Sequence, residues 1–209
     1  LAWRINFASA VFAAVTLGGV YLITRHFTHR VGALLASIVL LLSYTFWSQS
    51  IIAEVYTLAL AFIVIILLLL ILWHEQPVQR RWLLFVAGLL LGAGLGVHLF
   101  LLLIAPSAFL FVLAGVLFGS AQERGRGLHL LRLILGVIVG LACFFLLFAW
   151  MDSRPTPTNL LTTSIASSYD IWGLQASDLD SVPERFWISV SGLQWRDRMV
   201  PDDVNYARE

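Results

Sequence analysis

The chain has 209 residues, of which 60% are apolar and 12% are charged, and its formal net charge is +1. Soluble domains use roughly 25% charged residues, so this composition excludes an ordinary soluble protein and indicates an integral membrane protein. All thirteen residues counted as Lys or Arg are arginines. Residues 152–209 carry more acids than arginines, which indicates a membrane-embedded region followed by a segment in water.

Charge-free windows mark the expected membrane-spanning helices, because crossing a hydrocarbon core of about 30 Å takes roughly 20 apolar residues. The window from Trp82 to Gln122 would extend about 60 Å as one helix, so we divide it near His98. The predicted fold is an all-α, polytopic transmembrane helical bundle of about six spans with a small extracytoplasmic C-terminal segment. The spans are predicted at residues 5–24, 31–49, 51–73, 82–97, 99–118 and 132–151.

Arginines between the spans predict the orientation of the bundle. They fall in the loops after the first, third and fifth spans, at Arg25, Arg30, Arg80, Arg81, Arg124, Arg126 and Arg132. The positive-inside rule makes that side cytoplasmic. The start of the first span, the segment around Glu54, His98 and the tail after Met151 are then expected together on the extracytoplasmic face.

Small and aromatic residues predict how the spans pack. Glycines four residues apart favour close contacts between helices, and they occur at Gly88, Gly92 and Gly96 and at Gly136 and Gly140. Tryptophans near the expected span ends are typical of an aromatic belt, and they are Trp3, Trp47, Trp73, Trp82 and Trp150. We interpret the single cysteine, Cys143, as a small buried hydrophobic residue.

The tail after Met151 begins with Pro, Ser and Thr, which indicates a loop. Ser181 and Glu184 form a capping-box pattern before an apolar stripe, so a helix is predicted near residues 182–195. Two interpretations stay open, a helix lying flat in the membrane interface and a helix of a small extracytoplasmic domain. The chain starts without a Met or a signal peptide, and we expect further protein on both sides.

Glu54 is the leading candidate for a catalytic residue, because it is the only acid inside an apolar stretch. A charge costs about 2.5–3.5 kcal/mol at the membrane centre and less near the boundary, so such groups are usually functional. Its neighbours Trp47, Ser48, Gln49 and Tyr56 are candidate substrate-binding residues. The alternative is an interfacial carboxylate that reaches water from a helix end.

His98 and Arg4 are candidate contacts to a phosphate. His98 is the only ionisable side chain between Trp82 and Gln122 and can donate a hydrogen bond or accept a proton. Arg4 suits bidentate contact with phosphate oxygens. The alternatives are a turn histidine bonded to backbone and an arginine that anchors lipid headgroups. No metal-ligand spacing and no basic, aromatic-rich surface occurs, so we expect neither a metal site nor a nucleic-acid partner.

Three segments resemble those of a known family. They are Arg4 to Ala10 at the start of a span, Phe46 to Tyr56, and Gly94 to Leu99 followed by Ala105-Pro106. In this order they resemble the bacterial protein O-mannosyltransferase-like membrane proteins, a TMEM260-like group of the glycosyltransferase C superfamily, over most of residues 1–151. Val97 departs from the family pattern, in which a polar residue such as Asn precedes the histidine.

The resemblance implies an enzyme of the bacterial inner membrane that takes a sugar from a polyprenyl-phosphate-linked donor. The acceptor would be a protein or a cell-envelope molecule on the extracytoplasmic face, and no other cofactor is implied with certainty. By the same resemblance Arg4 and His98 would contact the lipid phosphate or the site mouth, and Glu54 would support the acceptor or a general base.

In such enzymes the general base lies in the first extracytoplasmic loop, which would precede Leu1, so this stretch alone is expected to be inactive. Two other functions stay open: a transporter or flippase for a lipid-linked or small solute, and a non-catalytic membrane scaffold. Transporters favour charges near the membrane midplane and internal repeats, and neither is evident in this sequence.

Overall fold

The structure is a computed structural model, and it describes residues 2–52, 54–118, 127–154 and 179–191. Every regular element in these ranges is a helix, which confirms the predicted all-α class. The chain divides into two compact units, Leu1–Ala142 and Cys143–Glu209. Most of the predicted loop after Met151, and residues 192–195 of the predicted tail helix, lie outside the described ranges.

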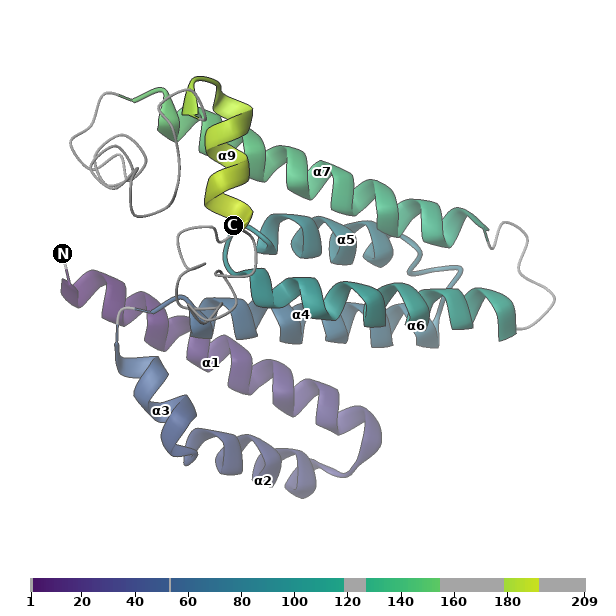
Figure 1. The fold of residues 1–209 in the computed structure, drawn as a ribbon. Helices are drawn as coiled ribbons and strands as arrows, with labels where there is room; N and C mark the ends of the chain where they lie inside the picture. Colours follow the sequence, from purple (N-terminus) through teal and green to yellow (C-terminus); the bar gives the residue numbers. More distant parts are fainter. Residues whose placement is uncertain (1, 53, 119–126, 155–178, 192–209) are drawn as a thin grey trace, which may run out of the picture. The chain divides into compact units, whose positions relative to one another are not determined.

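The first unit contains seven helical elements and the first part of an eighth (Figure 1). They are α1 (Ala2–Phe27), α2 (Arg30–Leu41), α3 (Tyr44–Ile51), α4 (Tyr56–Glu75), α5 (Trp82–Gly94), η1 (Leu99–Leu103), α6 (Ile104–Phe118) and α7 (Gly127–Asp152). Helix α1 contacts α2, α3 and α4, and η1 leads directly into α6.

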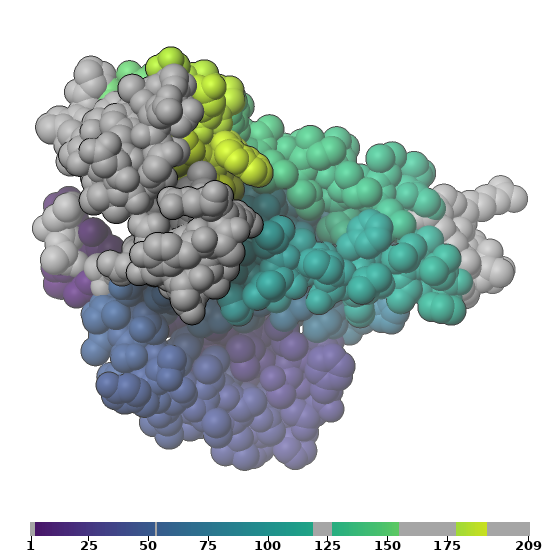
Figure 2. Space-filling model, in the orientation of Figure 1, coloured from purple at the N-terminus to yellow at the C-terminus, as the bar shows by residue number. Residues whose placement is uncertain are grey.

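Helix α4 is the central element of this unit, since it contacts α1, α3, α5, η1 and α6. Its residues are apolar on all sides, as expected for a helix surrounded by others. The core around it includes five residues that are 0% exposed, namely Ile66, Leu84, Ala87, Leu101 and Val112. In contrast, α2 lies at the surface of the unit (Figure 2), where Val31, Leu34, Leu35, Ile38 and Val39 are exposed.

Helices α1 and α4 run parallel, because polar contacts join their starts and their ends. Near the start of both, the Ser9 hydroxyl donates to the backbone carbonyl of Glu54 at 3.4 Å. At the other end, His26 Nδ1 lies 2.7 Å from Glu75 Oε1, and Arg80 Nη1 lies 3.3 Å from Glu75 Oε2. His26 and Glu75 therefore make a polar contact between the ends of α1 and α4.

Four glycines bring the backbones of α5 and α7 into contact within the first unit. A Cβ atom at Gly88 or Gly92 would overlap a backbone carbonyl oxygen of α7. A Cβ atom at Gly136 or Gly140 would overlap a carbonyl oxygen of α5. These contacts confirm the predicted close packing at the four positions. The prediction is wrong for Gly96, which lies beyond the end of α5.

The predicted number of spans, about six, is too high for the part of the chain that the structure describes. Four helices are long and apolar enough to cross a membrane: Trp3–Phe27, Tyr56–Glu75, Leu99–Phe118 and Gly127–Asp152. A fifth results if α2 and α3, which are bent by 66°, form one broken span. Helix α5 has 13 residues and extends only about 20 Å. These helices indicate an integral membrane protein.

Two helix ends explain the difference. Ser43 adopts an extended backbone between α2 and α3, so the predicted span at 31–49 is two helices. Helix α5 stops at Gly94, earlier than predicted. Counting charges detects neither event, because a bend or an early end needs no charged residue.

Four of the five tryptophans predicted for the aromatic belt lie at the surface, and one does not. Trp3, Trp47, Trp82 and Trp150 are more than half exposed, whereas Trp73 is 2% exposed and belongs to the core. The rings of Phe111 and His129 lie within 6.3 Å and 5.5 Å of Trp73. Cys143 is exposed, so its interpretation as a buried residue is wrong.

The second unit consists, in its described part, of the end of α7 and helix α9 (Val182–Ser191). The ring of Phe186 on α9 packs against Phe144, Phe145 and Phe148 of α7, with centroid distances of 5.1, 5.1 and 5.3 Å. A small aromatic cluster therefore fixes α9 to the end of α7.

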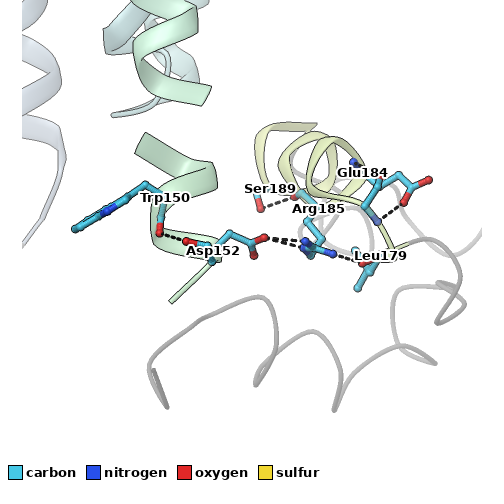
Figure 3. Close-up of polar contacts among 8 residues, drawn as sticks. Trp150, Asp152, Leu179, Glu184, Arg185 and Ser189 are labelled. Atoms are coloured by element: carbon cyan, nitrogen blue, oxygen red, sulfur yellow. Dashed lines mark hydrogen bonds and ion pairs between the residues drawn. The ribbon is translucent and has the colours of Figure 1, made fainter. Parts of the chain in front are cut away.

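Polar contacts complete this attachment (Figure 3). The Nε and Nη2 atoms of Arg185 lie 3.0 and 2.9 Å from Oδ2 of Asp152, and Nη1 donates to the carbonyl of Leu179 at 2.6 Å. At the start of α9, the Ser181 N–H donates to Glu184 Oε2 at 2.8 Å, and the Glu184 N–H donates to Ser181 Oγ at 3.4 Å. These reciprocal bonds confirm the predicted capping box.

Candidate functional site

The candidate residues lie at one end of the first unit, where α1 and α4 begin, α3 ends, and the turn between α5 and η1 occurs. Two long-range contacts define this end: Ser9 with the backbone of Glu54, and the ring of Tyr56 with the ring of His98. The His26–Glu75 pair marks the opposite end of α1 and α4.

Glu54 lies in the short connection between α3 and α4 and is exposed. Its N–H donates to the carbonyl of Ile52 at 2.9 Å, and its own carbonyl accepts the bond from Ser9. Within the described residues no hydrogen bond or ion pair involves its carboxylate. The backbone of Glu54 is thus held by α1, while its carboxylate is open to solvent or a ligand.

His98 lies in the turn between α5 and η1. The N–H groups of Val97 and His98 donate to the carbonyl of Gly94 at 2.8 and 3.1 Å, which winds the chain tightly there. A Cβ atom at Gly94 would meet a terminal methyl group of Leu101, so a larger residue here would need that side chain to shift. His98 Nδ1 accepts the N–H of Phe100 at 3.0 Å and thereby caps η1.

Tyr56 is the first residue of α4, and its ring centroid lies 5.3 Å from that of His98 at an interplanar angle of 43°. The tyrosine is 47% exposed, and His98 is half-buried. The contact joins two predicted site residues that are 42 positions apart (98 − 56).

The three candidates on α3 differ in their surroundings. Trp47 is 54% exposed. The Ser48 hydroxyl donates to the carbonyl of Thr45 in its own helix at 3.0 Å, as an ordinary helical serine does. The Oε1 atom of Gln49 is buried and has no hydrogen-bond partner among the described residues. Of the three, Gln49 is therefore the residue whose buried oxygen could still accept a hydrogen bond.

Arg4 is exposed near the start of α1. The rings of Trp3 and Phe7, which flank it in the sequence, stack with a centroid distance of 5.7 Å. It lies less than two helical turns before Ser9, at the same end of α1 as the Glu54 contact. No contact joins Arg4 to Glu54 or to His98 in the described residues. Arg4, Glu54 and His98 thus lie at one end of the unit but do not contact one another.

Sequence reasoning missed two polar residues at this end. Ser9 is 3% exposed, and Thr57 is 0% exposed with an Oγ1 atom that has no hydrogen-bond partner in the part of the chain that the structure describes. A buried polar group without a partner costs about 1–3 kcal/mol, which makes its presence informative. Two sequence features could have pointed to them. One is the serine within the segment from Arg4 to Ala10, and the other is the threonine directly after Tyr56.

The arrangement offers a carboxylate, a guanidinium, an imidazole and aromatic faces at the end of a membrane bundle. Within the described ranges, no group of three His, Cys, Asp or Glu side chains could hold a metal ion. Such a set of groups can bind an anionic headgroup and a hydroxyl-bearing molecule and assist transfer between them.

Comparison with known proteins identifies the family of this region. The family sequence model of the protein O-mannosyl-transferase TMEM260 N-terminal domain matches residues 1–118. That range is more than half of the 209 residues and includes every candidate site residue from Arg4 to His98. No curated protein and no solved structure matches the chain. The chain therefore belongs to the TMEM260-type protein O-mannosyltransferase family.

Proposed function

We propose that the complete protein transfers a sugar, mannose by the family's name, from a polyprenyl-phosphate-linked donor to a hydroxyl group of a protein or cell-envelope acceptor. The observation that supports this most directly is the family match over residues 1–118. We place the protein in a bacterial inner membrane, with the Glu54 end of the bundle on the extracytoplasmic face. The arginines around the opposite end support this orientation.

The chemistry suits groups located at the ends of helices. A lipid-linked donor keeps its prenyl chain in the bilayer and its phosphate at the surface, so cations and hydrogen-bond donors are needed there. In the reaction the acceptor oxygen bonds to the anomeric carbon, the bond from that carbon to the phosphate oxygen breaks, and prenyl phosphate leaves. A base takes the hydroxyl proton.

The candidate residues divide between these tasks. Arg4 and His98 bind the donor phosphate, and Glu54 supports the acceptor hydroxyl or the base that deprotonates it. The exposed rings of Trp47 and Tyr56 offer surfaces for the sugar, because aromatic side chains combine an apolar face with a polar edge. Ser48 and Gln49 supply hydrogen bonds on the same side of the bundle.

The test uses the complete protein in nanodiscs, a radiolabelled mannosyl-phosphoryl-polyprenol donor and a Ser/Thr-containing acceptor peptide. We expect Glu54→Gln to lower transfer at least tenfold, because the amide has no negative charge to assist the acceptor. Glu75→Gln is the matched control at the opposite end and should retain transfer. Normal transfer by Glu54→Gln would leave only the interfacial-anchor role for this residue.

The 66° break between α2 and α3 favours a second candidate, a transporter, because transporters use broken helices at their binding sites. The same preparation distinguishes the two functions. Movement of the intact lipid-linked sugar between leaflets of a liposome, without transfer to the peptide, would support transport and contradict our proposal.

A further inference from the structure

The ring of His98 is fixed on several sides. Nδ1 accepts the N–H of Phe100 at 3.0 Å, the ring of Tyr56 lies at 5.3 Å, and the ring of Phe100 lies edge-on at 6.4 Å. A ring nitrogen that accepts a hydrogen bond from an N–H carries no proton itself, so the proton of the imidazole is on Nε2. Among the described residues, no group bonds to this Nε2–H.

We propose that His98 acts in the site as a neutral hydrogen-bond donor through Nε2, and that Tyr56 is a positioning residue that holds its ring. This inference rests on the proposed function, because the acceptor of the bond is a phosphate oxygen of the lipid-linked donor. A neutral imidazole whose Nδ1 is occupied cannot take the proton of the acceptor hydroxyl. Its Nε2–H can instead stabilise the negative charge that develops on the leaving phosphate.

The start of α4 supports an anion at this place. Tyr56 is the first residue of this 20-residue helix, and the N-cap residue Val55 makes no side-chain cap. The N-terminus of a helix carries a partial positive charge and unpaired N–H groups, which favour a bound anion. An anionic ligand is therefore favoured beside His98, whose ring contacts the ring of Tyr56.

His29 provides a matched comparison within the same chain. Its Nδ1 accepts the N–H of Gly32 at 2.9 Å and caps α2, as His98 Nδ1 caps η1. His29 is exposed, lies near the opposite end of α1, and makes no ring contact among the described residues. It thus has the capping role alone.

Two substitutions separate the cap from the donor. In His98→Asn, the side-chain oxygen can accept the Phe100 N–H, but nothing reaches the position of Nε2. In His98→Gln, the amide nitrogen reaches that position, but the cap is lost. We expect His98→Asn to weaken binding of mannosyl-phosphoryl-polyprenol by about tenfold or more, as for one bond to a charged oxygen. His98→Gln should keep most of the affinity and lower the thermal stability.

Tyr56 is tested in the same assay. Tyr56→Ala removes the ring and should weaken binding of the donor, and Tyr56→Phe, which keeps the ring, should bind the donor more tightly than Tyr56→Ala. His29→Asn should change neither binding nor transfer. If His98→Asn binds and transfers normally, His98 is only a cap and the proposal is wrong. If both His98 variants bind the donor normally but stop transfer, His98 is a base, and the proposal is again wrong.

Nitrogen-15 NMR of histidine-labelled protein reads the tautomer directly, independently of transfer activity. We expect a protonated Nε2 and an unprotonated Nδ1 at His98, with the Nε2–H signal shifting when the donor is added. A proton on Nδ1, or no shift with the donor, would overturn the proposal even if both variants lose binding. If the wild-type protein transfers no sugar although this signal responds to the donor, the proposed function fails and the assignment of His98 stands.

A lipid headgroup offers the same phosphate chemistry, so the titration is repeated with phosphatidylglycerol. A shift with the polyprenyl phosphate donor at concentrations where phosphatidylglycerol has no effect supports the donor as the ligand. An equal response to both lipids would assign His98 to general headgroup binding and contradict our inference.

Discussion

His26 Nδ1 and Glu75 Oε1 lie 2.7 Å apart, although 49 positions separate the two residues in the sequence. This contact brings the last turn of α1, which contains Arg25, and the loop that contains Arg80 to one end of the bundle. Two of the arginine-bearing loops that the charge pattern assigns to the cytoplasm thus share an end, and Glu54 lies at the other.

Cysteine labelling tests which side of the membrane each end occupies. Because Cys143 is exposed, the starting variant is Cys143→Ser. In that background we expect Ser48→Cys to react with an impermeant maleimide in intact cells, and Val78→Cys, in the loop after α4, to react only after lysis. Labelling of both from outside would contradict the arrangement of the helices, and the reverse pattern would invert the orientation.

The glycine contact between α5 and α7 predicts opposite effects for one substitution at two positions. In Gly92→Ala the added methyl group meets the backbone of α7, and overpacking of this kind costs about 1–3 kcal/mol. In Gly18→Ala the methyl group meets nothing within 4 Å, and alanine favours a helix over glycine by up to about 1 kcal/mol. Thermal unfolding in detergent should show a lower Tm for Gly92→Ala only.

The Asp152–Arg185 pair predicts how firmly α9 is attached. The side chain of Asp152 is 4% exposed and that of Arg185 is 20% exposed, so removing one partner leaves a largely buried charge. We expect Asp152→Ala to weaken the attachment by about 2 kcal/mol. Hydrogen exchange of the α9 amides should then accelerate roughly thirtyfold.

Two variants check that prediction. Arg154→Ala removes an exposed guanidinium that lies 4.6 Å from the Trp150 ring centroid and should leave exchange in α9 unchanged. Replacing both Asp152 and Arg185 by leucine should restore part of the protection, because no buried charge is left alone. Unchanged exchange in Asp152→Ala would mean that the Phe186 cluster alone holds α9.

The capping box predicts a pH dependence for α9. Hydrogen bonds from the Ser181 side chain and backbone, assisted by the nearby charge of Arg185, lower the pKa of Glu184 below its ordinary value of 4.5. A lowered pKa means that the carboxylate stabilises the folded helix above pH 4.5 and that this contribution is lost as the pH falls through the lowered pKa. Carbon-13 NMR of the Glu184 carboxyl should show the low value, and Ser181→Ala should raise it towards 4.5.

The sequence by itself determined the all-α class, the membrane-embedded character, the capping box and the family resemblance. These features depend on local composition, or on residues within a few positions of each other. A charge-free run is compatible with hydrocarbon whatever its neighbours are, and Ser181 and Glu184 lie within one helical turn.

Only the tertiary structure decided which apolar residues face protein and which form the outer surface. In a membrane bundle both surroundings are apolar, so hydrophobicity cannot distinguish the buried Trp73 from the exposed Trp82. The same limit applies to the pairing of Ser9 with Glu54 and of Tyr56 with His98. These contacts depend on which faces of distant helices meet. The packing of all the helices together decides this, and no local sequence pattern encodes it.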